Sequence, residues 1–184
     1  MNKAVLIIDM LNDYFAEGRL KAHRKHLCQN INALAGWARE NKIKIIWVRQ
    51  EFKQDLSDAF LSMRNRLIYK TIENTDGAHI LSELNRHKED LEIVKKRYSA
   101  FFKTQLDTML EVDEITQLIL CGINSHACVR MTAIDAFQRD IEVIIASDCV
   151  DSYDIEHHKI SMLYLSKDIA RVLDNHQIMI EHPI

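Results

Sequence analysis

The sequence predicts an α/β protein: a three-layer α-β-α, Rossmann-like fold with a six-stranded, mainly parallel sheet. Short, nearly continuous apolar runs alternate with longer segments whose apolar residues recur at helical spacing. Strands that are apolar on both faces are typical of a parallel sheet with helices on both sides. The chain of 184 residues fits one domain, residues 1–184, and contains no linker, repeat or low-complexity segment.

The predicted strands are the apolar runs at residues 4–8, 44–48, 93–95, 117–122, 141–148 and 177–181. The predicted helices lie between them, at residues 27–38, 56–67, 106–110, 126–139 and 162–173. The segment 56–67 also fits a second interpretation, a mobile cover. In a parallel sheet of this kind, ligands bind outside the carboxyl ends of the strands. Polar residues that follow a strand are therefore the first candidates for chemistry.

Composition excludes several classes of protein. The net charge is −3 and there is no long basic run, so we expect no nucleic-acid partner. No apolar stretch reaches the 18 or more residues that span a membrane, so we expect no membrane partner. The N-terminal apolar run ends at Asp9 and is too short for a cleaved signal, which predicts a cytoplasmic protein. The four glycines lie far apart, so neither a dinucleotide fingerprint nor a Walker loop is present, and we expect no cofactor.

Metal and serine chemistry are also disfavoured. No two cysteines form a Cys-x-x-Cys pair, which weakens structural zinc and redox interpretations. His126-x-Cys128 and His157-His158 could be metal pairs, but nine histidines make chance neighbours common. We therefore predict no metal site. No Gly-x-Ser-x-Gly motif indicates a serine hydrolase.

Three polar residues follow three predicted strands. Asp9 follows the first strand, Lys95 ends the third, and Cys128 lies just after "QLILCG". Each has an ordinary explanation by itself: a turn residue, a surface lysine and a core cysteine. Together they place a base, a cation and a nucleophile at one edge of the sheet, which is the set that covalent acyl transfer needs.

Cys128 differs from the other cysteines in its position. The helix after "QLILCG" is predicted to begin near Ser125 or His126, so Cys128 falls in its first turn. A helix N-terminus stabilises a thiolate, which predicts a thiol pKa below the reference of about 8.5. The remaining three cysteines are expected to be inert core residues, namely Cys28, Cys121 and Cys149.

At these residues the chain resembles the isochorismatase-like cysteine hydrolase superfamily, which includes nicotinamidase, N-carbamoylsarcosine amidohydrolase and isochorismatase. The resemblance extends from "AVLIIDMLNDYF" through "VKKRYSAFF" and "CGINSHACVRMTAIDAF" to "DCVDSYDIEHHKISML". It implies a catalytic triad of Asp9, Lys95 and Cys128. Lys95 is preferred to Lys96 because the family's lysine stands three residues before the aromatic-Ser-Ala-Phe element, which begins here at Tyr98.

The resemblance implies further features of the site. It implies a cis peptide bond between Ile123 and Asn124, whose role would be to direct the Asn124 N–H, with that of Cys128, at the substrate oxygen. It also implies a homo-oligomer, a dimer or larger. Among the aromatic residues, Tyr14, Phe52 and Tyr98 are candidates for lining the substrate pocket.

The chain departs from the nicotinamidase pattern in two places. Leu11 stands where nicotinamidases typically carry Gln, and the metal-binding Asp-x-His element is replaced by "WVRQEFKQD". Ser125 stands where the family usually has Thr. The expected function is a cysteine-dependent hydrolase that cleaves an amide or ureido C–N bond of a small molecule. The alternatives are a vinyl-ether hydrolase of the isochorismatase type, and a binding or scaffold protein without catalysis.

Overall fold

The computed structural model describes residues 2–181, and its centre is a six-stranded sheet. The strands are β1 (Asn2–Ile8), β2 (Lys44–Gln50), β3 (Leu91–Lys95), β4 (Ile115–Gly122), β5 (Glu142–Val150) and β6 (Arg171–Leu173). Their spatial order is β3-β2-β1-β4-β5-β6, and every neighbouring pair is parallel. The chain reverses its direction of winding between β1 and β4, so the ends of these two strands flank the position where such sheets bind ligands. The predicted fold class is confirmed.

Six helices accompany the sheet within residues 2–181. They are α1 (Gly18–Glu40), α2 (Leu61–Arg66), α3 (Leu106–Val112), α4 (Arg130–Phe137), α5 (Ile155–Asp168) and α6 (Asn175–Ile180). A π-helical turn, Ser125–Val129, precedes α4. Within the same residues, no helix is both long enough and apolar enough to cross a membrane.

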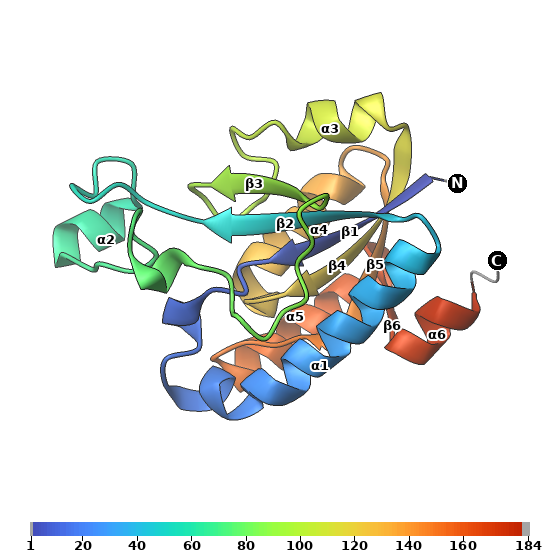
Figure 1. The fold of residues 1–184 in the computed structure, drawn as a ribbon, viewed down its shortest axis with the longest axis horizontal. Helices are drawn as coiled ribbons and strands as arrows, with labels where there is room; N and C mark the ends of the chain where they lie inside the picture. Colours follow the sequence, from blue (N-terminus) through green and yellow to red (C-terminus); the bar gives the residue numbers. More distant parts are fainter. Residues whose placement is uncertain (1, 182–184) are drawn as a thin grey trace.

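The helices cover both faces of the sheet (Figure 1). Alternate residues of β1 point to opposite sides: Val5 and Ile7 pack in the cluster that contains α1 and α6, whereas Leu6 and Ile8 pack with α3, α4 and α5. Strand side chains alternate in this way because successive Cβ atoms point to opposite faces. Both clusters are apolar and buried, which explains why the strands read as continuous apolar runs.

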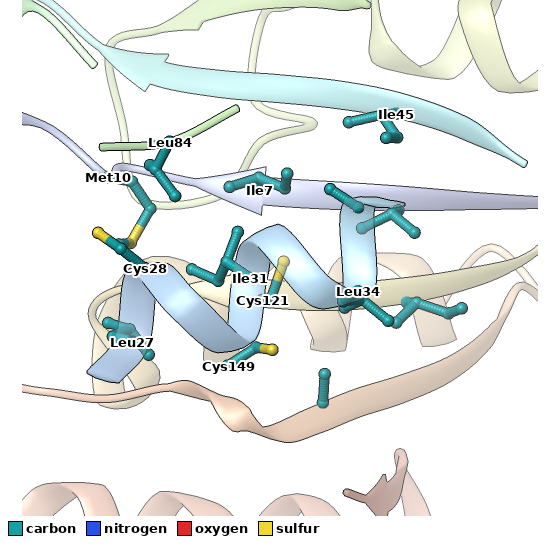
Figure 2. Close-up of a cluster of buried hydrophobic side chains, with 14 of the residues drawn as sticks. Ile7, Met10, Leu27, Cys28, Ile31, Leu34, Ile45, Leu84, Cys121 and Cys149 are labelled. Carbon is teal, nitrogen blue, oxygen red and sulfur yellow. The ribbon is translucent and has the colours of Figure 1, made fainter. Parts of the chain in front are cut away.

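The cysteines are divided between the two faces. Cys28, Cys121 and Cys149 lie together in the cluster under α1 (Figure 2), whereas Cys128 belongs to the cluster on the opposite face. Burial raises the pKa of Cys28 to about 11 and that of Cys149 to about 12. Burial keeps these two thiols protonated and away from the solvent, as expected of core residues.

The C-terminal part of the prediction is wrong. Residues 177–181, predicted to form the sixth strand, belong to α6 and its C-cap. The sixth strand is Arg171–Leu173, which lies inside the predicted helix 162–173, so that helix prediction is wrong beyond Asp168. The Asp174 side chain accepts a hydrogen bond from the Gln177 backbone, and the Gln177 side chain accepts one from the Asp174 backbone. This capping box starts a helix where the short apolar run alone fits either structure.

The segment after β2 contains less helix than predicted. Helix α2 covers only part of residues 56–67, because Leu56 and Leu67 have φ angles of 58° and 50°, outside the right-handed helical region. The loop has a small core of its own, made by Phe52, Leu56, Ala59 and Ile72. Figure 1 shows α2 beyond the carboxyl ends of β1 and β2, so this segment borders the site.

Candidate active site

The structure brings Asp9, Lys95 and Cys128 together at the carboxyl edge of the sheet. The Lys95 Nζ lies 2.7 Å from the Asp9 Oδ2 and 3.3 Å from the Cys128 Sγ. The three residues are 1%, 0% and 4% exposed. A carboxylate, an ammonium group and a thiol are therefore in direct contact inside the protein.

Asp9 is held in place by the neighbouring strand. It follows the last residue of β1 and has a φ of 54°. Its backbone N–H donates to the Val48 carbonyl at 2.8 Å, and its Oδ1 accepts a hydrogen bond from the Gln50 backbone N–H at 2.8 Å. The carboxylate thus has a fixed orientation, with its other oxygen facing Lys95.

Lys95 is a buried cation with three polar neighbours. Besides Asp9 and Cys128, its ammonium group donates to the Arg97 carbonyl oxygen at 3.2 Å. Burial alone would lower the pKa of Lys95, but the charges of Asp9 and Cys128 outweigh this effect and raise it. Lys95 therefore stays protonated, and the buried charge is balanced by its partner.

A close approach between β1 and β4 positions the turn that carries Cys128. A Cβ atom on Gly122 would lie 2.0 Å from the Ile8 carbonyl oxygen, and Gly122 has a φ of 105°, so only glycine fits there. The next peptide bond, Ile123–Asn124, is cis. Cys128 then lies in the π-helical turn, where the Val129 N–H donates to the Asn124 carbonyl at 3.2 Å. π-Helical turns are often found at functional sites.

The thiol pKa of Cys128 differs from the sequence prediction. Burial raises this pKa to about 12, the Lys95 cation opposes the rise, and the Asp9 carboxylate adds to it. The expectation of a lowered pKa is therefore wrong for the free protein. Asp9 and Lys95 already neutralise each other, so a thiolate would add a net negative charge in a buried place. In this structure the thiol keeps its proton, and a carboxylate lies within hydrogen-bonding reach of it.

Asn124 lies directly before the π-helical turn that contains Cys128. It is 8% exposed, and its side-chain oxygen accepts a hydrogen bond from the Tyr153 N–H at 3.3 Å. Its backbone N–H has no acceptor among residues 2–181. A donor of this kind is available for an oxygen atom of a bound ligand.

The predicted pocket residues occupy different positions. The Tyr14 hydroxyl donates to the Gln50 Oε1 at 2.5 Å, and burial together with the charges of Asp9 and Cys128 raises its pKa well above the ordinary range. Tyr98 is 48% exposed and lies at the surface of the site, where burial and the charge of Cys128 raise its pKa.

Phe52 lies further from the opening. It is fully buried. The centroid of its ring lies 5.8 Å from that of Phe60, and the Phe60 centroid lies 4.8 Å from that of Tyr98. Phe60 therefore stands between Phe52 and Tyr98, and the three rings form a continuous aromatic wall. Sequence reasoning did not select Phe60, because its segment could not be placed.

Gln50 is the second residue that sequence reasoning missed. It is 4% exposed, pairs in register with Lys95 across β2 and β3, and has a side-chain nitrogen with no hydrogen-bond partner among residues 2–181. Its backbone N–H donates to the Asp9 carboxylate and its side-chain oxygen accepts from Tyr14, so the Gln50 side chain lies in the same buried group of polar residues. The signal was present in the sequence: Gln50 is a polar residue at the end of an apolar strand.

Two serine–histidine pairs link the π-helical turn that contains Cys128 to residues 152–158. Ser125 Oγ lies 2.8 Å from His158 Nδ1, and Ser152 Oγ lies 2.6 Å from His126 Nδ1. Burial lowers the pKa of both histidines, so they are mostly neutral near pH 7. Within residues 2–181, no cluster of three or more His, Cys, Asp or Glu side chains is arranged to hold a metal ion.

The chain belongs to the isochorismatase family, because the model of the isochorismatase domain matches residues 3–177. It is 32% identical to a protein of Arabidopsis thaliana named as a probable inactive nicotinamidase, over 88% of this chain and 87% of that one. The solved nicotinamidase/pyrazinamidase of Bacillus subtilis is 27% identical, with a TM-score of 0.83, over 95% of this chain and 100% of that one. An isochorismatase-like hydrolase of Alkaliphilus metalliredigens shares the fold, with 24% identity and a TM-score of 0.86 over 98% and 99% of the two chains.

Proposed function

We propose that this protein is a cysteine-dependent hydrolase that cleaves a non-peptide C–N bond, amide or ureido, of a small molecule. The observation that carries this proposal is a pair of buried contacts made by the Lys95 ammonium group. Its Nζ lies 2.7 Å from the Asp9 carboxylate and 3.3 Å from the Cys128 sulfur. It contains a base, a charge that stabilises an anion, and a nucleophile within one hydrogen-bonded group.

In the proposed acylation step, Asp9 accepts the Cys128 proton while the sulfur attacks the carbonyl carbon of the substrate. The raised thiol pKa makes a permanent thiolate unfavourable, so proton transfer accompanies attack. The negative charge moves to the substrate oxygen, where the backbone N–H groups of Asn124 and Cys128 stabilise it. Loss of one such donor typically costs on the order of 10²–10³ in rate.

The tetrahedral intermediate then collapses. The C–N bond breaks, Asp9 gives its proton to the leaving nitrogen, and Cys128 remains as a thioester. In the second step, Asp9 accepts a proton from water, and the oxygen of that water attacks the thioester carbon. The C–S bond breaks, the acid product leaves, and the proton returns to the sulfur. Lys95 stays charged throughout and stabilises the anion formed at each stage.

The residues around the triad bear on the choice of substrate. Leu11 is fully buried where nicotinamidases typically carry Gln, so this position offers no amide to a ligand. Gln50 offers one instead, through its unpartnered side-chain nitrogen. A substrate with a hydrogen-bond acceptor next to the scissile carbonyl would satisfy this donor, because an unpaired buried donor costs about 1–3 kcal/mol.

A non-catalytic role is the competing proposal, and one comparison favours it. The relative from Arabidopsis thaliana, 32% identical to this chain, is named as a probable inactive nicotinamidase. Such a role predicts no turnover of any small amide, even with Asp9, Lys95 and Cys128 in place.

The test is ammonia release from a panel of small amides, ureido compounds and pyridine carboxamides. The wild-type protein should release ammonia from at least one of them, and Cys128→Ala should release none above background. Cys28→Ala is the matched control, since Cys28 is also buried but belongs to α1, on the opposite face of the sheet. Equal ammonia release by Cys128→Ala would contradict the thioester. No turnover of the whole panel by the wild type would favour the non-catalytic role.

A further inference from the structure

The π-helical turn that contains Cys128 is held from α4 on one side. The Thr132 Oγ1 donates a hydrogen bond to the Cys128 carbonyl at 2.7 Å and accepts one from the Ala100 N–H at 3.0 Å. Thr132 lies in α4 and is fully buried. The position of Cys128 is therefore fixed by α4 and by the segment that follows β3.

The start of the turn is held from the segment that follows β5. The Ser125 N–H donates to the Asp151 carbonyl at 2.9 Å, and the Asn124 side-chain oxygen accepts a hydrogen bond from the Tyr153 N–H at 3.3 Å. The Ser125 Oγ lies 2.8 Å from the Nδ1 of His158 in α5. Because Ser125 directly follows Asn124, these contacts set the direction of the Asn124 backbone N–H, which has no acceptor among residues 2–181.

The backbone support at Asp151 is rigid. Its carboxylate lies 3.0 Å from the Arg19 Nη2 and 2.8 Å from the His23 Nδ1, and both partners belong to α1. Its Oδ1 also accepts a hydrogen bond from the Ser152 N–H at 2.8 Å. The backbone contact of Ser125 is therefore built into the fold, whereas its side-chain contact depends on the protonation of an imidazole.

Burial decides the direction of the hydrogen bond between Ser125 and His158. Ser125 is 0% exposed, and within residues 2–181 the His158 Nδ1 is the only hydrogen-bond partner of its hydroxyl. If the imidazole donated, the hydroxyl hydrogen would be buried without an acceptor, which costs free energy. The hydroxyl therefore donates to Nδ1. The proton of the neutral imidazole is then on Nε2, and His158 is only half-buried, so water can accept it.

We propose that Ser125 and His158 are positioning residues for the proposed hydrolysis, and that the hydrogen bond from the Ser125 hydroxyl to neutral His158 holds the Asn124 N–H toward the substrate oxygen. This inference rests on the proposed hydrolase activity. Both residues act through the backbone of the turn and not on the substrate itself. Protonation of His158 occupies Nδ1, removes the acceptor of the hydroxyl and breaks this hydrogen bond.

The first test compares two replacements of Ser125 that have the same shape. Ser125→Thr keeps the hydroxyl and Ser125→Val lacks it, so steric strain is common to both. With a compound that the panel identifies as a substrate, the valine variant should have a kcat about 10–100-fold below that of the threonine variant, because a slightly displaced oxyanion donor costs rate on this scale. KM should differ less than about threefold, since the donor acts mainly in the transition state. Iodoacetamide should label Cys128 equally fast in both variants, because Thr132 holds the nucleophile.

Ser161→Ala is the matched control for loss of a buried serine hydroxyl. Ser161 also lies in α5, but its Oγ accepts a hydrogen bond from the Arg130 side chain at 3.3 Å. This variant should keep the kcat of the wild type.

The second test is the pH dependence of kcat. Burial lowers the pKa of His158, the Arg19 charge lowers it further, and Asp151 raises it; His126 is close enough for the charge of His158 to lower its pKa. Only the neutral imidazole accepts the hydroxyl hydrogen, so the kcat of the wild type should fall as the pH drops through the pKa of His158, below 6.5. His158→Gln keeps a side-chain oxygen that accepts the hydrogen bond but does not titrate. This part of the acid limb should therefore disappear, while any part caused by Asp9 remains.

A third measurement needs no substrate and tests the hydrogen bond itself. The pKa of His158, followed by NMR, should be higher in Ser125→Val than in Ser125→Thr, because valine gives the neutral imidazole no hydrogen bond. Equal pKa values in the two variants would show that the hydroxyl does not donate to His158, and would overturn the proposal.

The outcomes separate this inference from the proposed activity. Equal kcat values in Ser125→Thr and Ser125→Val, in a protein whose turnover depends on Cys128, would overturn the positioning role and leave the hydrolase proposal standing. An acid limb in His158→Gln identical to that of the wild type would do the same. A wild type that turns over no compound of the panel, or that Cys128→Ala matches, would instead contradict the proposed function, and this inference would fall with it.

Discussion

The replacement Asp9→Asn should make Cys128 more reactive toward alkylation while it abolishes turnover. Asp9 has two opposing effects in the proposed reaction. Its negative charge disfavours the thiolate in the free protein, and its basicity removes the thiol proton during attack. Asparagine removes both. Lys95 then lacks its anionic partner and favours ionisation of the thiol that it contacts, Cys128.

The size of the effect follows from the charges involved. A thiol with a pKa of about 12 is ionised at pH 7.5 to a fraction of only about 10⁻⁴ to 10⁻⁵. A unit charge at about 4 Å contributes about 4 kcal/mol at an effective dielectric constant of 20, which is close to a thousandfold in the ionisation constant. Relaxation of the protein around the new side chain and entry of water into the site reduce this electrostatic effect. We therefore expect alkylation of Cys128 at pH 7.5 to accelerate at least about tenfold in the variant.

The assay is the pH dependence of iodoacetamide labelling, followed for each cysteine by peptide mass spectrometry. In the wild type, labelling of Cys128 should rise about tenfold per pH unit from neutral pH to about pH 10. In Asp9→Asn the same rise should begin at a lower pH. Cys121, fully buried under α1, should stay unlabelled in both proteins and so reports an intact fold. Equal or slower labelling of Cys128 in the variant would refute the argument.

Four further changes test the structure. Gly122→Ala should lower the free energy of unfolding by more than about 2 kcal/mol, because the new Cβ would lie 2.0 Å from the Ile8 carbonyl oxygen. Urea denaturation measures the free energy of unfolding, and a loss under about 1 kcal/mol would contradict this steric argument. Gly36→Ala, inside α1 with no atom within 4 Å of the new Cβ, should instead stabilise by about 0.5–1 kcal/mol in the same experiment. Burial lowers the pKa of His158, so the unfolded chain takes up the proton first as pH falls below about 6.5, and the free energy of unfolding should fall there. His158→Gln should flatten that part of the stability profile, and an equally steep profile would show that His158 does not cause the loss. Lys95→Met leaves a buried carboxylate without its cation and should cost about 3–5 kcal/mol of stability as well as turnover, whereas an unchanged melting temperature would show that the ion pair is dispensable.

The position of the site could be predicted because parallel strands bring their carboxyl ends to one edge. Asp9, Lys95 and Cys128 are separated by up to 119 positions, yet each lies at the carboxyl end of a strand or shortly after it. The parallel sheet brings these strand ends together at one edge. The cysteines could be sorted for a similar reason. Cys121 lies inside an apolar strand, whereas Cys128 follows one.

The ionisation of Cys128 could not be predicted in the same way. A position near a helix N-terminus lowers a thiol pKa, but burial and a nearby carboxylate raise it. Neither the depth of burial nor the contact with Asp9 is visible in a sequence. The balance of opposing effects therefore required the structure.

The errors at residues 177–181 and 56–67 have local causes. The run at residues 177–181 is too short for its apolar spacing to distinguish strand from helix, and the capping box at Asp174 decides the outcome. The segment 56–67 has helical spacing, but the left-handed backbone of Leu56 and Leu67 limits the helix. Phe60 remained outside the predicted pocket for this reason.

The most direct test of the central proposal is to look for the thioester on Cys128. A compound that releases ammonia in the panel would be mixed with the protein, quenched in acid within the first turnovers, and analysed by intact and peptide mass spectrometry. We predict an acyl group of the substrate's mass on the peptide that contains Cys128, absent from Cys128→Ala and removed by hydroxylamine. Turnover with no acyl group on this peptide at any quench time, together with undiminished activity of Cys128→Ala, would contradict the proposed mechanism.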